Sequence, residues 1–209
     1  MTEPLMTGAV GLVQDPVDGD TEDLAQQVAD AAASFLLALR AIADDEAGSG
    51  AVPLLLLEVS QVLLAGARLA VQRDVDLDEE FEPEPGPDPD VDALRMRLAD
   101  VLDGVDGYHE VFDPYGRGGE VDVVPSAISD DLASTASALA HGLAHHRAGR
   151  VREALWWWQF SYVASWGAEA SAALRALQSV VAHDRLDADL VGEPARVAAA
   201  EAVLGGAPA

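Results

Sequence analysis

The 209-residue chain contains no cysteine and no lysine. Without cysteine it can form no disulfide, no thiolate nucleophile and no cysteine-ligated zinc site. Its twelve basic residues are therefore all arginines, and they are outnumbered by 37 acidic residues, which gives a formal net charge of -25. Because so acidic a chain repels nucleic-acid phosphates and anionic lipid surfaces, we expect no direct binding to nucleic acid and no membrane association.

The N-terminus lacks the positively charged region of an export signal, since Glu3 is its first charged residue. The one long apolar run, residues 51–71, is interrupted by Glu58, Gln61 and Arg68. Each of these side chains is costly at the centre of a bilayer. We therefore interpret the run as a core helix and predict a soluble, cytoplasmic protein.

Half of the residues are apolar, which is enough to build a real core in a chain of this length. Apolar residues recur at three- and four-residue steps, which predicts an all-α fold. We expect an irregular bundle of about five helices in a single domain over residues 21–187. The predicted helices cover residues 22–45, the run that begins at Pro53, and residues 89–105, 126–148 and 151–183.

Two terminal tails, an acidic linker and a glycine-rich loop are not expected to form helices of this bundle. Residues 1–20 and 188–209 show no periodicity and are predicted to be loosely ordered tails. Residues 73–90 alternate acidic residues with proline, which blocks a helix, so we expect an acidic linker inside the domain. Residues 106–125 are rich in glycine, and the short extended piece over 121–124 has no predicted partner, so no sheet is expected.

The last predicted helix carries all four tryptophans, between Trp156 and Trp166. In a straight helix, with about 100° per residue, Trp156, Phe160 and Val163 share one core-facing stripe. This long helix is therefore predicted to be the centre of the bundle. Trp158 lies about 160° from the middle of that stripe. We thus predict that Trp158, with Trp157 beside it, is exposed and anchors a partner or ligand.

Charged residues on this mostly apolar helix extend the candidate binding site. Glu153 and Arg175 must be paired if they are buried, and such pairs either stabilise a fold or line a pocket. The candidate binding residues are thus Trp157, Trp158, Arg175 and Glu153.

Histidine spacing suggests two possible metal sites. His141 and His145 are four residues apart, as helical metal ligands often are, but a helical projection places them opposite the apolar stripe, so we interpret them as solvent-facing. His146, His183 and Asp184 follow the residue order of helical metal-dependent phosphohydrolases and form the alternative metal site. No metal or other cofactor is predicted.

The tryptophan-rich helix also carries a family resemblance. The run Glu153-Ala154-Leu155-Trp156-Trp157-Trp158-Gln159-Phe160-Ser161-Tyr162, with Trp166-Gly167 and the run 173–177 after it, resembles the signature of a bacterial family catalogued as domain of unknown function 5063. The run 55–57 and the loop 111–115 resemble its actinobacterial members. The likeness covers about residues 22–187 and implies an all-helical domain of unknown activity, with no catalytic residues to carry over.

Because the sequence contains no recognisable catalytic constellation, we do not predict an enzyme. The favoured function is a non-catalytic interaction or accessory module that binds a basic or apolar protein partner. Two alternatives remain open at this point. One is a metal-dependent helical phosphohydrolase, and the other is a small-molecule binder with an aromatic pocket.

Overall fold

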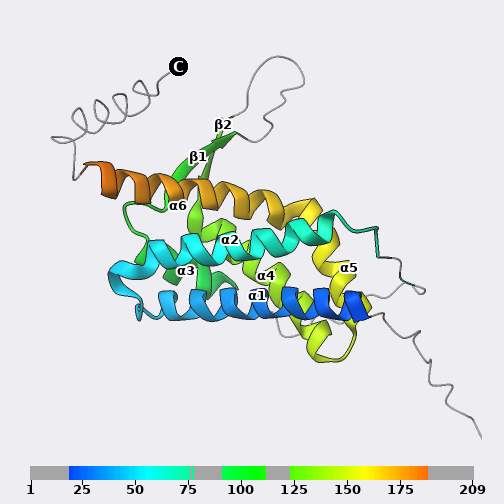
Figure 1. The fold of residues 1–209 in the computed structure, drawn as a ribbon. Coiled ribbons are helices and arrows are strands. Elements are labelled where there is room, and N and C mark those ends of the chain that lie inside the picture. Colours follow the sequence, from blue (N-terminus) through cyan, green and yellow to red (C-terminus); the bar gives the residue numbers. More distant parts are fainter. Residues whose placement is uncertain (1–18, 76, 78–90, 112–122, 188–209) are drawn as a thin grey trace, which may run out of the picture.

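The computed structural model describes residues 19–75, 77, 91–111 and 123–187. It confirms the all-α prediction, because helices make up most of these residues and only one small sheet accompanies them. The helices are α1 (Gly19–Ala43), η1 (Gly48–Gly50, a 3₁₀-helix), α2 (Ala51–Ala70), α3 (Val91–Val101), α4 (Ile128–Arg147), α5 (Val151–Ser161) and α6 (Gly167–Asp187) (Figure 1).

The two expected tails and most of the expected acidic linker lie outside the described residues. The linker's first residues are described, and they are attached to α5. Gln159 donates hydrogen bonds to the carbonyl oxygens of Leu69 and Arg73, and its own side-chain oxygen accepts one from the backbone N–H of Val75 at 3.0 Å. The segment that follows α2, up to Val75, is therefore held against α5.

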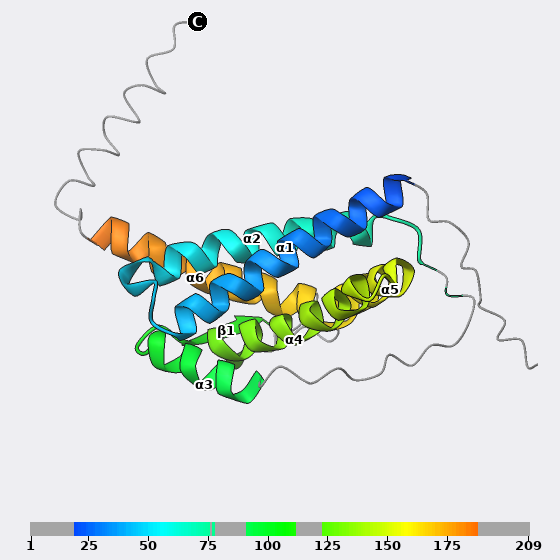
Figure 2. The ribbon, with the colours of Figure 1, turned by 90° about the horizontal axis from the view of Figure 1, so that it is seen from below.

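The helices enclose one apolar core. Helix α4 packs against α1, α3, α5 and α6, while α2 packs against α1 and α6. Figure 2 shows α1 and α2 side by side along one flank of the bundle, with α3 and α4 along the other. The largest fully buried side chains come from α1 to α5 and from the segment between α5 and α6, and they include Phe35, Leu55, Leu98, Leu132, Trp158 and Trp166.

Helix α2 is, together with η1, long and apolar enough to cross a membrane by length and composition alone. Core helices pass the same test. Its Leu55, Val59 and Val62 belong to the shared core, and Glu58 is buried beside them. Its opposite side exposes Leu57 and Leu64, which are separated by two helical turns.

The expectation that no sheet forms is wrong. Strand β1 (Gly107–Val111) pairs antiparallel with β2 (Val123–Ala127), in a register that places Gly107 opposite Ala127 and Val111 opposite Val123. This hairpin projects from the helices next to α4 and α6 (Figure 1). The predicted extended piece over residues 121–124 thus contributes to β2, and its partner is the strand that the sequence did not reveal.

The expected straight helix over residues 151–183 is interrupted. Residues Tyr162–Trp166 form a π-helix, η2, and the chain turns there, so that α5 runs at a steep angle to α6 (Figure 1). A π-turn holds one more residue than an α-turn. The inward-facing stripe of α5 is therefore shifted by one position, from the predicted Trp156, Phe160 and Val163 to Leu155, Gln159 and Tyr162.

Two glycines make room for the aromatic rings that this shift turns inward. A Cβ atom on Gly142 of α4 would collide with the indole of Trp158. A Cβ atom on Gly66 of α2 would likewise collide with the rings of Tyr162 and Trp166. Helices α2 and α4 thus each offer a position without a side chain, on which a large ring rests.

Candidate functional site

Apolar residues of the tryptophan-rich segment reach the outside of the bundle, and we define the half-buried Trp156 and the exposed Phe160 and Val163 as the α5 surface. Phe160 is 55% exposed and Val163 is 72% exposed. The rings of Trp156 and Phe160 stack with centroids 5.4 Å apart and an interplanar angle of 2°. The straight-helix prediction placed all three in the core, and it is wrong for Phe160 and Val163 because of the π-turn.

A row of further rings continues from the α5 surface onto α4. The indole of Trp157 lies 6.4 Å from that of Trp156 and 4.2 Å from the imidazole of His141. The His141 ring lies 5.0 Å from that of His145 in an edge-on arrangement. Trp157 is half-buried, and its indole N–H donates a 2.9 Å hydrogen bond to the carbonyl of Ala138. The row is therefore fixed in place by α4.

The predicted exposure of Trp158 is wrong. Its side chain is fully buried, and its indole N–H donates a hydrogen bond to the carbonyl of Leu139. The His146 ring lies 6.0 Å from it. Since Trp158 is closed in by the facing backbone of α4, it cannot anchor a partner, and of the two tryptophans proposed as anchors only Trp157 reaches the surface.

The other two candidate binding residues do not lie together. Glu153 is buried and accepts hydrogen bonds from Arg150, the shorter of which is 2.8 Å long. This pair supports the turn between α4 and α5. Arg175 lies on the exposed side of α6, beyond the π-helix. The structure therefore gives Glu153 a structural partner and leaves Arg175 apart from the aromatic row.

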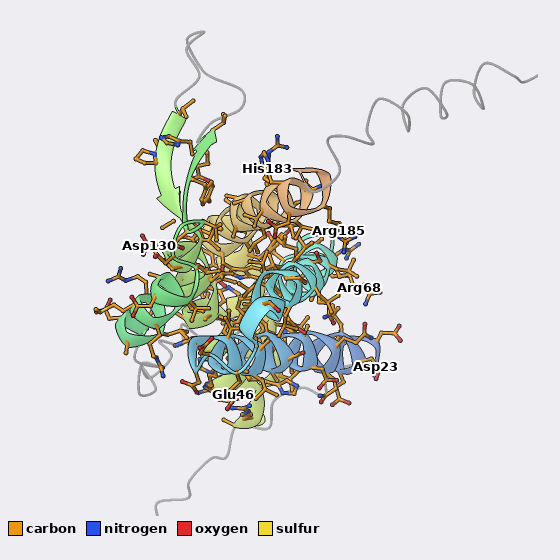
Figure 3. All side chains as sticks on the ribbon, turned by 90° about the vertical axis from the view of Figure 1, so that its left-hand side faces the viewer. Asp23, Glu46, Arg68, Asp130, His183 and Arg185 are labelled. Carbon is orange, nitrogen blue, oxygen red and sulfur yellow. The ribbon has the colours of Figure 1, made fainter. Side chains whose placement is uncertain are left out.

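The alternative metal ligands are also separated. His146 lies at the end of α4, next to α5, whereas His183 and Asp184 lie near the end of α6. Figure 3 looks at the molecule from that end of α6, where His183 and Arg185 are labelled. Within the described ranges, no group of three or more metal-binding side chains is brought together. The residue order of the phosphohydrolases therefore does not correspond to a shared site among these residues.

The prediction that His141 and His145 both face solvent is wrong for His145, which is buried, while His141 is half-buried. Their Nε2 atoms approach to 3.3 Å. Burial lowers the pKa of His145, and the neighbouring His141 and Arg150 lower it further, against an opposing effect of Glu153. Packing of α5 against this side of α4 covers a face that the helical projection assigned to solvent.

A second polar cluster, which no sequence pattern indicated, joins the hairpin to α4. The hydroxyl of Tyr108 on β1 donates a short, 2.5 Å hydrogen bond to Asp131, and Ser126 on β2 approaches the same carboxyl at 3.5 Å. We call these three residues the Asp131 network. Burial raises the pKa of Asp131 to about 7, and the charges of Glu110, Glu169 and Asp130 add to this, while the Tyr108 hydrogen bond opposes it. Burial likewise raises the pKa of Tyr108.

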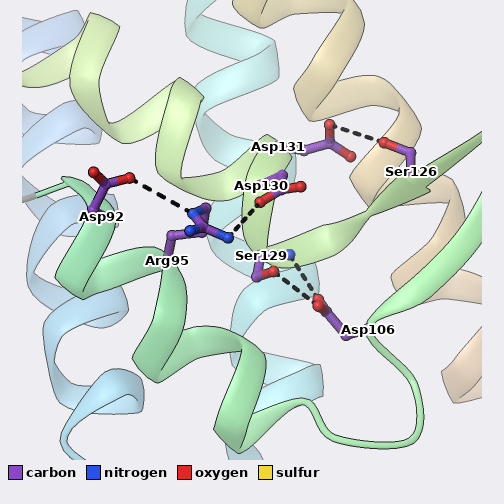
Figure 4. A network of polar contacts seen from close by, with 7 residues as sticks. All are labelled: Asp92, Arg95, Asp106, Ser126, Ser129, Asp130 and Asp131. Atoms are coloured by element: carbon purple, nitrogen blue, oxygen red, sulfur yellow. Dashed lines mark hydrogen bonds and ion pairs between the residues drawn. The ribbon is translucent and has the colours of Figure 1, made fainter.

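Other carboxylates hold the same end of α4 (Figure 4). Asp106 accepts 2.8 Å hydrogen bonds from both the backbone N–H and the hydroxyl of Ser129, and thereby satisfies a free donor of the first helical turn. Arg95 of α3 forms ion pairs with Asp92 and with Asp130 of α4. These contacts make the start of α4 a structural junction between α3, the hairpin and the bundle.

Comparison with known families fits this architecture. The model of a family described as a domain of unknown function, DUF5063, matches residues 19–183. The chain belongs to the DUF5063 family. The match includes the whole tryptophan-rich segment and both helices that pack on it, so the resemblance noted from the sequence is confirmed at the level of the family.

A solved structure shares the fold of this DUF5063 protein. It is protein BF1032 from Bacteroides fragilis, a structural-genomics target, which superposes with a TM-score of 0.62 at 20% sequence identity. The similarity covers 76% of this chain and 92% of that one. At this level of identity the likeness establishes the fold alone. Among curated proteins, none matches the chain.

Proposed function

We propose that this DUF5063 protein is a non-catalytic interaction module and that the α5 surface docks an apolar segment of a partner protein. The observation that carries the proposal is the stacked pair of Trp156 and Phe160 on the outside of the bundle, continued by Val163. Aromatic residues dominate the binding energy of protein interfaces when a partner covers them. Apolar residues that adjoin one another at a surface mark interaction sites more often than isolated ones do.

The charges along the stretch of sequence that carries the α5 surface guide the choice of partner. Residues 132–168 contain three arginines, Arg147, Arg150 and Arg152, and one acidic residue, Glu153. The rest of the chain is strongly acidic, so this stretch differs in sign from its surroundings. A basic partner would therefore gain little electrostatic attraction from this stretch. We therefore favour the apolar partner of the two that the composition suggested, with a neutral or acidic rim around its apolar centre.

The rigidity of the surface supports docking. Trp157 is held by α4 through its hydrogen bond to Ala138, and Trp156 and Phe160 lie on consecutive turns of the same helix. Side chains that are already ordered lose less conformational entropy when a partner covers them. The α5 surface is thus arranged for binding before a partner arrives.

The test is affinity purification of cross-linked complexes from the native host, using the full chain and two surface variants, Phe160→Asp and Val163→Asp. A specific partner should be recovered with the unchanged chain and lost with both variants. Leu64→Asp is the matched control, because Leu64 is 60% exposed on α2 and equally apolar. If the partner is retained by the α5 variants, or lost equally with Leu64→Asp, the proposal is wrong.

A further inference from the structure

The two histidines on α4 form a pair that the proposed docking function does not use. His141 and His145 are one helical turn apart, and their Nε2 atoms are their closest polar atoms, at 3.3 Å. This contact is a hydrogen bond between the two rings, and histidines one helical turn apart are also the arrangement with which helices bind divalent metal ions. The reason for dismissing this pair from the sequence was that both rings would face solvent, and the structure removes that reason.

The distances fit a single shared ion. Zinc binds imidazole nitrogen at about 2.05 Å, so an ion at that distance from both Nε2 atoms would form an N–Zn–N angle of about 107°, close to the tetrahedral value. With each nitrogen about 1.15 Å from its ring centroid, such an ion would also place the centroids about 5.1–5.2 Å apart. The observed separation is 5.0 Å.

The surroundings hold the two rings in this arrangement. The indole of Trp157 lies 4.2 Å from the His141 ring and is itself fixed by its hydrogen bond to α4. The backbone carbonyl of His145 accepts a 3.0 Å hydrogen bond from the N–H of Arg150, whose side chain is hydrogen-bonded to Glu153. Ordered neighbours that fix the orientation of a ligating ring increase metal affinity. The two rings are therefore held close together by packed neighbours.

We propose that His141 and His145 bind one Zn²⁺ ion through their Nε2 atoms, with both rings protonated at Nδ1 and water completing the tetrahedral coordination. Imidazole ligands suit zinc, copper and nickel, and the tetrahedral angle favours zinc over ions that prefer square-planar geometry. The site is independent of the α5 surface, although Trp157 adjoins both.

The experiment is isothermal titration of the full-length protein with ZnCl₂ in a buffer that does not chelate metals. Excess Mg²⁺ is present throughout, because Mg²⁺ occupies carboxylate sites and leaves imidazole to zinc. We expect one zinc per chain, and we expect the ¹⁵N imidazole signals of two histidines to shift on binding. His141→Gln should weaken binding at least tenfold.

The controls are His146→Gln and His183→Gln, each of which removes a different histidine and should leave zinc affinity unchanged. His141 is half-buried, so its replacement by glutamine is the milder of the two ligand changes, and circular dichroism verifies that the variant is folded. The proposal is overturned if zinc does not saturate a single site in the presence of Mg²⁺. It is also overturned if His141→Gln binds as tightly as the unchanged chain, or if His183→Gln weakens binding equally.

Discussion

Trp156 and Trp158 are two positions apart on α5 and lie in opposite surroundings. Trp158 is fully buried against Gly142, whereas Trp156 is half-buried and stacks on an exposed ring. We predict that Trp158→Ala lowers the free energy of unfolding by about 3–5 kcal/mol, as other large-to-small core changes do. Trp156→Ala should lower it by about 1 kcal/mol, because less apolar area returns to water. Urea denaturation of the two variants measures the difference, and equal losses would contradict the structure.

The sequence identified the right segment and assigned the wrong residues within it. Four clustered tryptophans indicate a core helix that can also present a surface, and both features are present. Which ring faces which way depends on the helical phase, and one extra residue in a turn changes that phase. The predicted solvent exposure of His145 was wrong for a related reason. Its burial depends on how closely α5 packs on α4, and a helical projection of α4 alone does not include α5.

Asp131 makes the folded state sensitive to pH in a predictable direction. Its pKa is about 7 in the folded protein, above the ordinary value of 3.8 for an aspartate, so folding disfavours the charged carboxylate. The stabilising contribution is therefore complete below about pH 4 and is lost as the pH rises through about 7. We predict that Asp131→Asn raises the free energy of unfolding at about pH 8 by about 1–3 kcal/mol, after allowance for solvent screening.

The control for this prediction is Asp130→Asn. Asp130 precedes Asp131, its carboxylate is 58% exposed, and it pairs with Arg95. Its replacement should leave the pH dependence of stability largely unchanged. Unfolding is measured by chemical denaturation at several pH values between about 5 and 8. If Asp131→Asn leaves the unfolding free energy at about pH 8 unchanged or lower, burial of the Asp131 carboxylate does not destabilise the fold at that pH as described.

At the scale of elements, the contact of α4 with α5 depends on Gly142. An alanine there would push its methyl group into the Trp158 indole, and overpacked cores lose about 1–3 kcal/mol. We predict a loss of this size in the free energy of unfolding for Gly142→Ala. Gly50→Ala is the matched control, because nothing lies within 4 Å of the added Cβ and its φ of -86° suits any residue. It should be neutral or stabilise by about 0.4–1 kcal/mol.

The helices themselves were predictable, since each predicted helix overlaps an observed one and all five begin within a few residues of their predicted starts. The hairpin was not predictable, because its half-buried face carries Tyr108 and Glu110 on β1 rather than alternating aliphatic residues. The hairpin is attached through the Asp131 network, and hydrogen bonds between distant residues leave no periodic pattern. Of the candidate site, the aromatic row was located, but its outward residues were not.

For the whole molecule, the dominant quantity is its charge. The described ion pairs are exposed in at least one partner and join Arg95, Arg97 and Arg150 to carboxylates, while the chain as a whole carries a formal charge of -25. Self-repulsion of this size destabilises a compact state. We predict that the melting temperature rises as NaCl increases from about 0.01 M to about 0.15 M, where the Debye length falls from about 30 Å to about 8 Å. A falling melting temperature would show that ion pairs outweigh repulsion.

The π-turn at residues 162–166 makes the identity of the outer surface depend on chain length rather than on residue type. Removing one residue, for instance Ser165, would restore an ordinary α-helical turn and rotate α5 by about 100° relative to α6. The stripe of Trp156, Phe160 and Val163 would then turn toward the core, and Trp158 would leave Gly142 and turn outward. A single deletion that changes no aromatic residue would thus bury Trp156 and expose Trp158. Iodide quenching of single-tryptophan versions of the natural and the shortened chain would detect this exchange.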